Sequence, residues 1–140
     1  ENTSRVIGIQ DIRPDMIERE SSMQELYTLS RNYTAFMCCS DYYAVMLMTY
    51  FRDRGVKIPE DLSITGFDDV MIARVSLPAL TTVHQNPTKK GRLAVDDLLR
   101  MVEGEEPPEW DTKLPVELVI RDSVKAVTPY GNDEGVFTEE

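Results

Sequence analysis

The sequence predicts an α/β fold in which a mainly parallel sheet is flanked by helices. Short β-branched or apolar runs alternate along the chain with longer segments in which apolar residues recur at helical spacing. One short run, residues 34–40 (TAFMCCS), is apolar on both of its faces, as is typical of a strand that lies between two layers of helices. The 140 residues fit one domain of this class.

The first three expected elements are a strand, a helix and a strand. Residues 5–10 (RVIGIQ) are a β-branched run that predicts a strand, and the turn after it places Pro14 near the start of a helix. This helix covers residues 15–30, where apolar residues recur at about helical spacing among charged ones. Residues 34–40 form the second strand.

The next helix, residues 41–54, begins with Ser40 or Asp41 as its N-cap and stops at Gly55. It is apolar on two faces, so we expect its own sheet to cover one face and to leave the other for a partner. The first face consists of Ala44, Leu47, Met48 and Phe51, and the second consists of Tyr43, Met46 and Tyr50.

A loop, two strands and a short helix are expected next. Pro59 cannot lie in the middle of a strand without losing a ladder hydrogen bond, so residues 56–62 predict a loop. Residues 63–67 (SITGF) form a strand, residues 70–75 a short helix, and residues 79–85 (ALTTVHQ) another strand.

A long helix and a final strand complete the expected domain. The helix covers residues 87–103, with Pro87 at its first position and Gly104 as its stop. An acidic loop broken by prolines leads to a strand at residues 114–121 (LPVELVIR). Residues 126–140 carry four acidic residues and little apolar surface, so we expect a flexible acidic tail.

Charge and hydropathy exclude several function classes. The chain has 15 Lys and Arg residues against 25 Asp and Glu residues, a formal charge of −10, and no stretch basic enough to bind a phosphate backbone unaided. No apolar run approaches the roughly 20 residues of a membrane-spanning helix, and the first ten residues lack the pattern of a secretory signal. A soluble protein without a membrane partner is expected.

The two cysteines, Cys38 and Cys39, are adjacent, and neighbouring side chains of a strand point to opposite faces. We therefore expect reduced thiols and a cytoplasmic location. No CxxC spacing or histidine-rich partner is present, so no metal site or other cofactor is predicted.

Candidate site residues follow the ends of the expected strands. In parallel sheets, ligands bind beyond the carboxyl ends of the strands. Ser40 and Asp41, Asp68 and Asp69, and His84 and Gln85 occupy such ends and are expected to converge on one crevice.

Catalysis by these residues is disfavoured. Adjacent carboxylates rarely reach the separation of about 5 to 9.5 Å that paired acid–base catalysis requires, so Asp68 and Asp69 are more simply a turn, a helix cap or a ligand site. A lone histidine such as His84 is more often structural, and neither a nucleophile elbow nor a glycine-rich phosphate loop occurs. The protein is therefore not expected to be an enzyme.

The ordered motifs of residues 34–124 resemble a known family. They read SD..A, G..IPEDLSITGFDD, P.LTTVHQ, G..A...LL and LP.ELVIRDS. This succession resembles the C-terminal stretch of lactose/galactose-repressor family transcription regulators. The resemblance implies the C-terminal subdomain of a type I periplasmic-binding-protein-like fold, with an effector pocket between two subdomains.

The resemblance also implies roles for individual residues. Asp68 would contact a sugar or similar polar effector, Ser40 replaces an asparagine that often reaches the ligand, and Gln85 occupies a pocket and hinge position. Asp41 would act as a cap and hinge-side organiser, and Asp69 would cap the helix that follows it. An aromatic that stacks on the effector in some members would fall near residues 12–14, where this chain has none.

Two helices, residues 41–54 and 70–75, resemble the dimer-forming elements of the family. A homodimer is therefore expected, and its interface candidates are Val45, Met46, Met71, Ile72 and Val75. By the same resemblance, residues 1–125 would be a partial effector-binding and dimerisation domain, and the helix at residues 87–103 would belong to a missing N-terminal subdomain.

The apolar stripe of this long helix needs a cover. Burial of a side chain such as Leu93, Leu98 or Val102 contributes about 1.5 to 3 kcal/mol, so exposure would be unfavourable. We therefore expect the helix to dock on its own sheet or on another copy of the chain, with exchange of elements as one route.

Together these features predict the effector-sensing and dimerising part of a bacterial transcriptional repressor. A small polar effector would control operator binding by a helix-turn-helix headpiece that lies outside these residues. The alternative is a periplasmic-type solute-binding protein, which shares the architecture.

Overall fold

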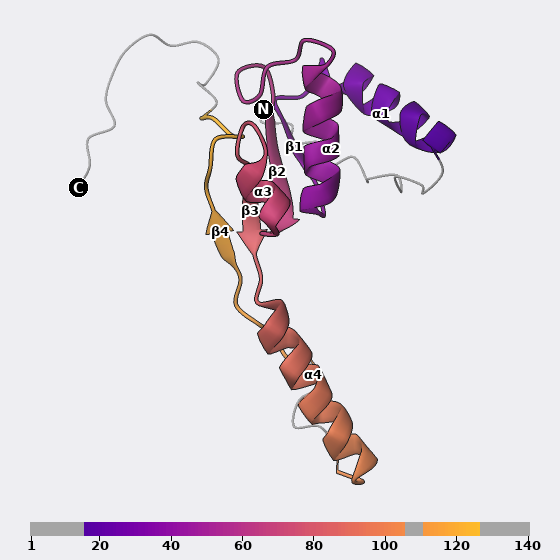
Figure 1. Cartoon of the computed structure of the whole chain (residues 1–140), viewed down its shortest axis with the longest axis vertical. Coiled ribbons are helices and arrows are strands. Elements are labelled where there is room, and N and C mark those ends of the chain that lie inside the picture. The colour runs from indigo at the N-terminus through magenta and orange to yellow at the C-terminus, as the bar shows by residue number, and fades with distance from the viewer. Residues whose placement is uncertain (1–15, 106–110, 127–140) are drawn as a thin grey trace, which may run out of the picture.

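Four strands form one mixed sheet in the computed structural model, which describes residues 16–105 and 111–126 (Figure 1). The strands are β1 (Ala35–Met37), β2 (Ser63–Asp68), β3 (Thr81–His84) and β4 (Glu117–Val119), and they lie in the order β1-β2-β3-β4. The first three are parallel, and β4 runs antiparallel to β3. The predicted α/β fold with a mainly parallel sheet is therefore confirmed.

The helices lie close to the expected bounds. They are α1 (Met16–Ser30), α2 (Asp41–Arg52), α3 (Met71–Val75) and α4 (Pro87–Val102). The strand expected at residues 5–10 and the tail expected at residues 126–140, apart from its first residue, lie outside the described residues. No helix in the described ranges is long and apolar enough to cross a bilayer.

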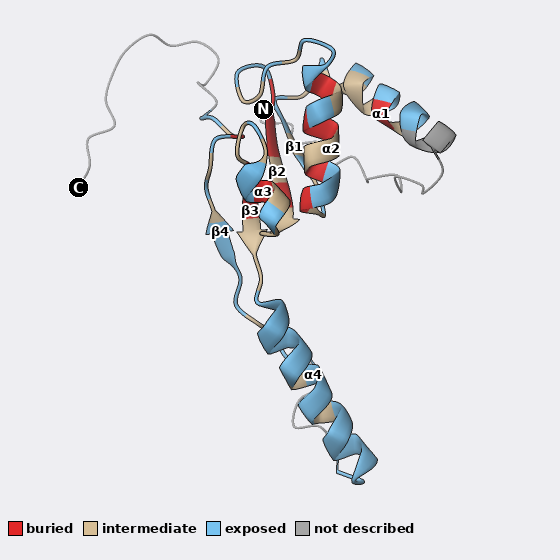
Figure 2. Ribbon diagram, viewed as in Figure 1, coloured by how far each residue is buried: buried red, intermediate tan, exposed pale blue. Residues whose placement is uncertain are grey.

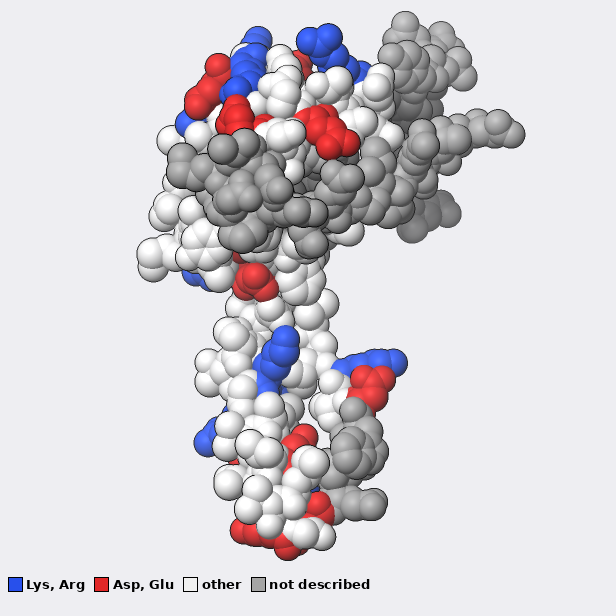
Figure 3. All heavy atoms as spheres, turned by 90° about the vertical axis from the view of Figure 1, so that its right-hand side faces the viewer, with Lys and Arg blue, Asp and Glu red and all other residues white. Residues whose placement is uncertain are grey.

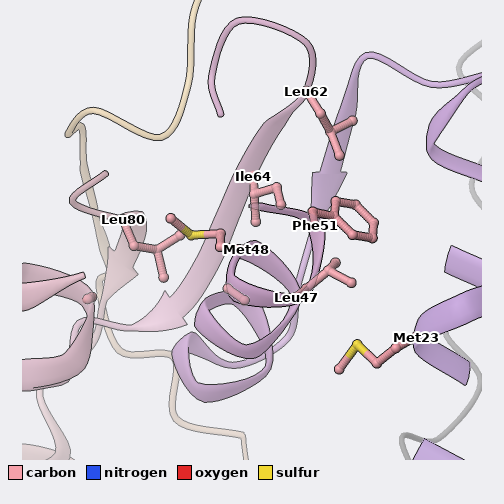
Figure 4. Close-up of a cluster of buried hydrophobic side chains, with 9 residues drawn as sticks. Met23, Leu47, Met48, Phe51, Leu62, Ile64 and Leu80 are labelled. Atoms are coloured by element: carbon pink, nitrogen blue, oxygen red, sulfur yellow. The ribbon is translucent and has the colours of Figure 1, made fainter. Parts of the chain in front are cut away.

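The core forms where α2 packs on β2 and α1 packs on α2 (Figure 1). Burial of each large apolar side chain there contributes about 1.5 to 3 kcal/mol, which makes this cluster the main source of stability. The ring of Phe51 lies at its centre and meets Tyr27 edge-on at 5.9 Å between centroids. The cluster consists of Met23, Ala44, Leu47, Met48, Phe51, Leu62, Ile64, Ala73 and Leu80 (Figure 4).

The face of α2 that was predicted to meet the sheet, with Ala44, Leu47, Met48 and Phe51, is fully buried. Burial on both faces was wrong for the strand within residues 34–40. It is only three residues long as β1, and the side chain of Met37 is 80% exposed. Phe36 packs against the core, whereas Ala35 and Met37 point to the opposite face and are exposed, so only one face of β1 is covered within the described residues.

Helix α4 projects away from the sheet, and none of its residues is buried (Figures 1 and 2). The sheet therefore does not cover this helix, as one of the two expectations had it, and docking on another copy stays a prediction. The chain continues from the carboxyl end of β3 through Gln85 and Asn86 into α4, which leads away from the sheet (Figure 1). The side chain of Asn86 caps the helix by accepting a hydrogen bond from the backbone N–H of Lys89 at 2.9 Å.

Candidate functional site

The tips of β2 and β3 bring Asp68 and Gln85 together. Asp68 is the last residue of β2 and is in register with His84, the last residue of β3. Gln85 follows directly, and its side-chain Nε2 donates a hydrogen bond to Oδ1 of Asp68. A carboxylate and an amide thus meet at the carboxyl edge of the parallel strands, the edge at which such sheets bind ligands.

The backbone at this tip is unusual for residues other than glycine. Asp68 has a φ of 111° and Asp69 a φ of 55°, both in the positive region that side chains with a Cβ disfavour. Residues in such conformations persist only where the surrounding structure holds them, and they concentrate at functional sites. Contacts of Asp41 and Asp69 supply that support.

Asp41 is fully buried and joins three segments. Its Oδ1 accepts a hydrogen bond from the Thr82 hydroxyl at 2.5 Å, and its Oδ2 accepts one from the backbone N–H of Val70 at 2.8 Å. The sheet makes room for this carboxylate at Gly66, where any Cβ would collide with it. The N-cap of α2 is Ser40, whose hydroxyl accepts from the N–H of Tyr42 at 3.3 Å, so Asp41 does not cap its own helix.

The buried carboxylate of Asp69, whose side chain is 4% exposed, meets two arginines and a histidine. Arg121 donates to Oδ1 at 2.5 Å, Arg74 donates to Oδ2 at 2.9 Å, and Nδ1 of His84 lies 3.2 Å from Oδ2. The predicted cap of the following helix by Asp69 is wrong, because its carboxylate turns to these groups. The N-cap of α3 is Val70, which has no side-chain cap hydrogen bond.

The environment of Asp69 favours its charged form. Burial by itself raises the pKa of the carboxyl, but hydrogen bonds and charge attraction from Arg121 and Arg74 outweigh burial. The pKa of Asp69 therefore lies below its ordinary value, and the group is ionised at neutral pH.

Sequence reasoning missed Arg121 and Thr82, which hold the two buried carboxylates. Arg121 lies 52 residues after Asp69, and Thr82 lies 41 residues after Asp41. A basic residue at the end of the apolar run LPVELVIR was the one available signal for Arg121. Its partner could not be identified without the strand order.

The expected interface residues differ in exposure between α3 and α2. Met71 and Val75 on α3 are exposed, and Ile72 is half-buried. Val45 and Met46 on α2 line an open groove of about 410 Å³ beside α1. Its remaining lining residues are Glu20, Met23, Thr49, Tyr50 and Asp53, so it shares no residue with the Asp68 tip.

The two cysteines form no disulfide, and the charged side chains in Figure 3 are of both signs. Cys38 and Cys39 are free, and burial, followed by the effect of Cys39, raises the pKa of the Cys38 thiol to about 12, which keeps it protonated. The described residues contain no group of three or more His, Cys, Asp or Glu side chains arranged to hold a metal ion. On the face shown in Figure 3, basic and acidic side chains lie interspersed.

Comparisons with known proteins place this geometry in context. The sequence model of the periplasmic binding protein-like domain matches residues 6–124. The HTH-type transcriptional repressor PurR of Haemophilus influenzae is 36% identical over 108 residues, which are 75% of this chain and 32% of that protein. The ribose operon repressor of the same species is 37% identical over 102 residues, covering 73% of this chain and 31% of the repressor.

Solved structures of regulators are also similar to this chain. The lac repressor dimer bound to operator and the anti-inducer ONPF has a TM-score of 0.66 at 28% identity, covering 75% of this chain and 38% of that one. A periplasmic binding protein/LacI transcriptional regulator from Alkaliphilus metalliredigens, complexed with D-xylulofuranose, has a TM-score of 0.64 at 27% identity, with coverages of 76% and 38%. The chain spans about a third of the length of the curated relatives.

Proposed function

Because the chain belongs to the periplasmic binding protein-like domain family, we propose that it is the effector-sensing part of a bacterial transcriptional repressor. The resemblance to lactose/galactose-repressor regulators is confirmed by its curated relatives and structural neighbours. The alternative of a periplasmic solute-binding protein has less support, because the curated relatives named above are repressors. Those relatives are not enzymes.

The observation that carries the proposal is the pair of Asp68 and Gln85 at the sheet edge. A carboxylate accepts hydrogen bonds from hydroxyl groups, and an amide both donates and accepts, so together they suit neighbouring hydroxyls on one small molecule. In the cap of α2 the Ser40 hydroxyl accepts a hydrogen bond from the N–H of Tyr42, so its own O–H can still donate to a ligand. A sugar or related polar metabolite fits this chemistry, and a structural neighbour is complexed with D-xylulofuranose.

The position of Gln85 suggests how binding would be transmitted. Gln85 lies two residues before the start of α4, so a ligand that engages its amide acts directly on the segment that leads into this helix. An effector that binds one arrangement of this segment better than another shifts the population toward it. The hydrogen bonds of Asp41 and Asp69 would hold the strand ends next to this segment rigid. A DNA-binding headpiece outside these 140 residues would respond to the shift in population.

Calorimetry on the protein made from its complete coding sequence tests the effector site. D-ribose, D-galactose, sucrose, ribose 5-phosphate and guanine are titrated into the wild type and into Asp68→Asn, because asparagine tolerates a positive φ. Loss of a charged hydrogen-bond partner should weaken binding by about tenfold or more. The exposed Asp53 supplies the control variant Asp53→Asn. Undiminished affinity in Asp68→Asn would refute the site.

A homodimer is the second part of the proposal. The lac repressor neighbour is a dimer, and we propose that a second copy of this chain would meet the following residues: Val45, Met46, Met71, Ile72 and Val75. Met71→Asp should raise the dimer dissociation constant at least about tenfold in sedimentation experiments, since it places a charge in an apolar contact. Met37→Asp is the matched control, because these methionines are 78% and 80% exposed. Equal dissociation constants for both variants would exclude Met71 from the interface.

A further inference from the structure

We propose that Arg121 is a positioning residue of the effector site: through the carboxylate of Asp69 it holds Asp68 in the conformation that faces Gln85. This inference rests on the proposed function only in that it calls the site around Asp68 and Gln85 an effector site. The contacts that carry it are independent of any ligand. Arg121 is not among the site residues that the sequence predicted.

Arg121 is held at three points of its own. Its backbone N–H donates to Oγ1 of Thr81 at 2.8 Å, and Nη1 of its guanidinium donates to the backbone carbonyl of Leu80 at 2.8 Å. The other nitrogen, Nη2, donates to Oδ1 of Asp69 at 2.5 Å. The planar guanidinium therefore joins the start of β3 to the turn after β2 in a fixed geometry.

The turn needs such support because of its backbone. Asp68 and Asp69 both have positive φ angles, which chains avoid at residues with a Cβ. On the far side of the turn, the N–H of Val70 is held by the buried Asp41. Asp69 is thus the link between Asp68 and the rest of the turn, and the position of its carboxylate limits the conformations open to Asp68.

Among the side chains that contact the carboxylate of Asp69, Arg121 is the best placed to fix it. Its side chain is 15% exposed, against 61% for Arg74 and 42% for His84. Arg74 and His84 both approach Oδ2, whereas Arg121 bonds to Oδ1. Loss of Arg121 would remove the most buried partner and let the carboxylate rotate toward α3 and solvent.

The test compares ¹⁵N-labelled wild-type chain with Arg121→Gln, Arg121→Lys and a control, Arg52→Gln, whose side chain is exposed and pairs with Asp53. The signals to follow are the backbone amides of Asp68 and Asp69, the side-chain amide of Gln85, and the ring of His84. The ring is unambiguous because the sequence contains one histidine.

In Arg121→Gln the signals of Asp68, Asp69, Gln85 and His84 should shift while those of the α2–β2 core stay in place. Arg121→Lys, which keeps the charge but not the two-point geometry, should shift them less, and Arg52→Gln should leave them unchanged. Unmoved Asp68 and Gln85 signals in a folded Arg121→Gln chain would overturn the inference. If Arg121→Gln does not fold, the same signals of Arg121→Lys are compared with those of the wild type, and unmoved signals would overturn the inference. If neither variant folds, Arg121 serves global stability, and the inference is overturned as well.

The same variants separate this inference from the proposed function. D-ribose, D-galactose and sucrose are titrated into wild type, Asp68→Asn and Arg121→Gln. If Arg121→Gln shifts the Asp68 signal but Asp68→Asn binds the sugar as well as wild type does, positioning stands and the effector assignment fails. If Asp68→Asn loses the sugar while Arg121→Gln leaves both the spectrum and the affinity unchanged, the effector site stands and Arg121 has no positioning role.

Discussion

The carboxylate of Asp41, at the start of α2, accepts a hydrogen bond of 2.5 Å from the hydroxyl of Thr82 in β3. Both side chains are fully buried, and the second carboxylate oxygen of Asp41 holds the N–H of Val70. A buried carboxylate is tolerated only with such partners. The bond therefore fixes the first turn of the main core helix to the strand whose tip carries Gln85.

Removal of this carboxylate should be strongly destabilising. Asp41→Ala leaves a buried hydroxyl and a backbone N–H without their acceptor, at about 1 to 3 kcal/mol for each group. We expect the free energy of unfolding, measured with urea, to fall by about 2 to 5 kcal/mol. Thr82→Val in a double-mutant cycle isolates the shared bond, and Asp53→Ala on the exposed side of α2 should change stability by less than about 0.5 kcal/mol. A loss below about 1 kcal/mol in Asp41→Ala would contradict this role.

Gly66 should not tolerate a methyl group. A Cβ there would lie 2.8 Å from Cδ2 of Leu80 and still closer to Oδ1 of Asp41, so Gly66→Ala should destabilise the fold by about 1 to 3 kcal/mol. Gly91→Ala is the matched control, because nothing lies within 4 Å of its Cβ position and it is in α4. That control should be stabilising by up to about 1 kcal/mol. Thermal unfolding that shows the same change for both variants would rule out the close approach.

Stability should fall in acid through Asp69. Its folded pKa is depressed, so its contribution to stability is present above the unfolded pKa of about 4 and is lost as the pH falls through the folded value. Urea unfolding at pH 7, 5, 4 and 3 should therefore show a steeper loss below about pH 4 for the wild type than for Asp69→Asn. Asp53→Asn should follow the wild type. Parallel curves for wild type and Asp69→Asn would mean that the cluster contributes nothing.

The apolar stripe of α4 should cause association of the 140-residue chain. Leu98 and Val102 are exposed, and large exposed apolar patches promote protein contacts. Size-exclusion chromatography with light scattering should show a mass above the 16.0 kDa of one chain. Leu98→Lys with Val102→Lys should shift the mass toward 16.0 kDa, whereas Lys90→Glu on the same helix should not. A monodisperse monomer before substitution would show that the stripe is not an association surface.

Much of the fold could be predicted because its signals are local. Helical spacing, an N-cap at Ser40, proline at the start of α4 and glycine at its end act within one or two turns, so the sequence carries them directly. The buried face of α2 followed from the same periodicity. The exposure of one face of β1 did not, because it depends on which other segments of the chain pack against that face.

Part of the candidate site could likewise be predicted from the sequence, and part could not. The succession of motifs was enough to place Asp68 and Gln85 at strand tips, and the register of β2 with β3 then makes them neighbours. The partners of Asp69 and Asp41 could not be predicted, because Arg121 and Thr82 lie far along the chain and reach them through strand order.

By itself, the sequence determined the element order, the α/β class and the family of this protein, since periodicity, capping and ordered motifs are written along the chain. Only the tertiary structure decided that Asp69 meets Arg121 instead of capping α3, and that α4 stands free of its own sheet. The physical reason is that a buried charge takes whichever opposite charge the packed sheet brings within reach. For α4, likewise, the apolar stripe is set by the sequence, but whether another surface covers it depends on how the whole chain packs, and none of its residues is buried.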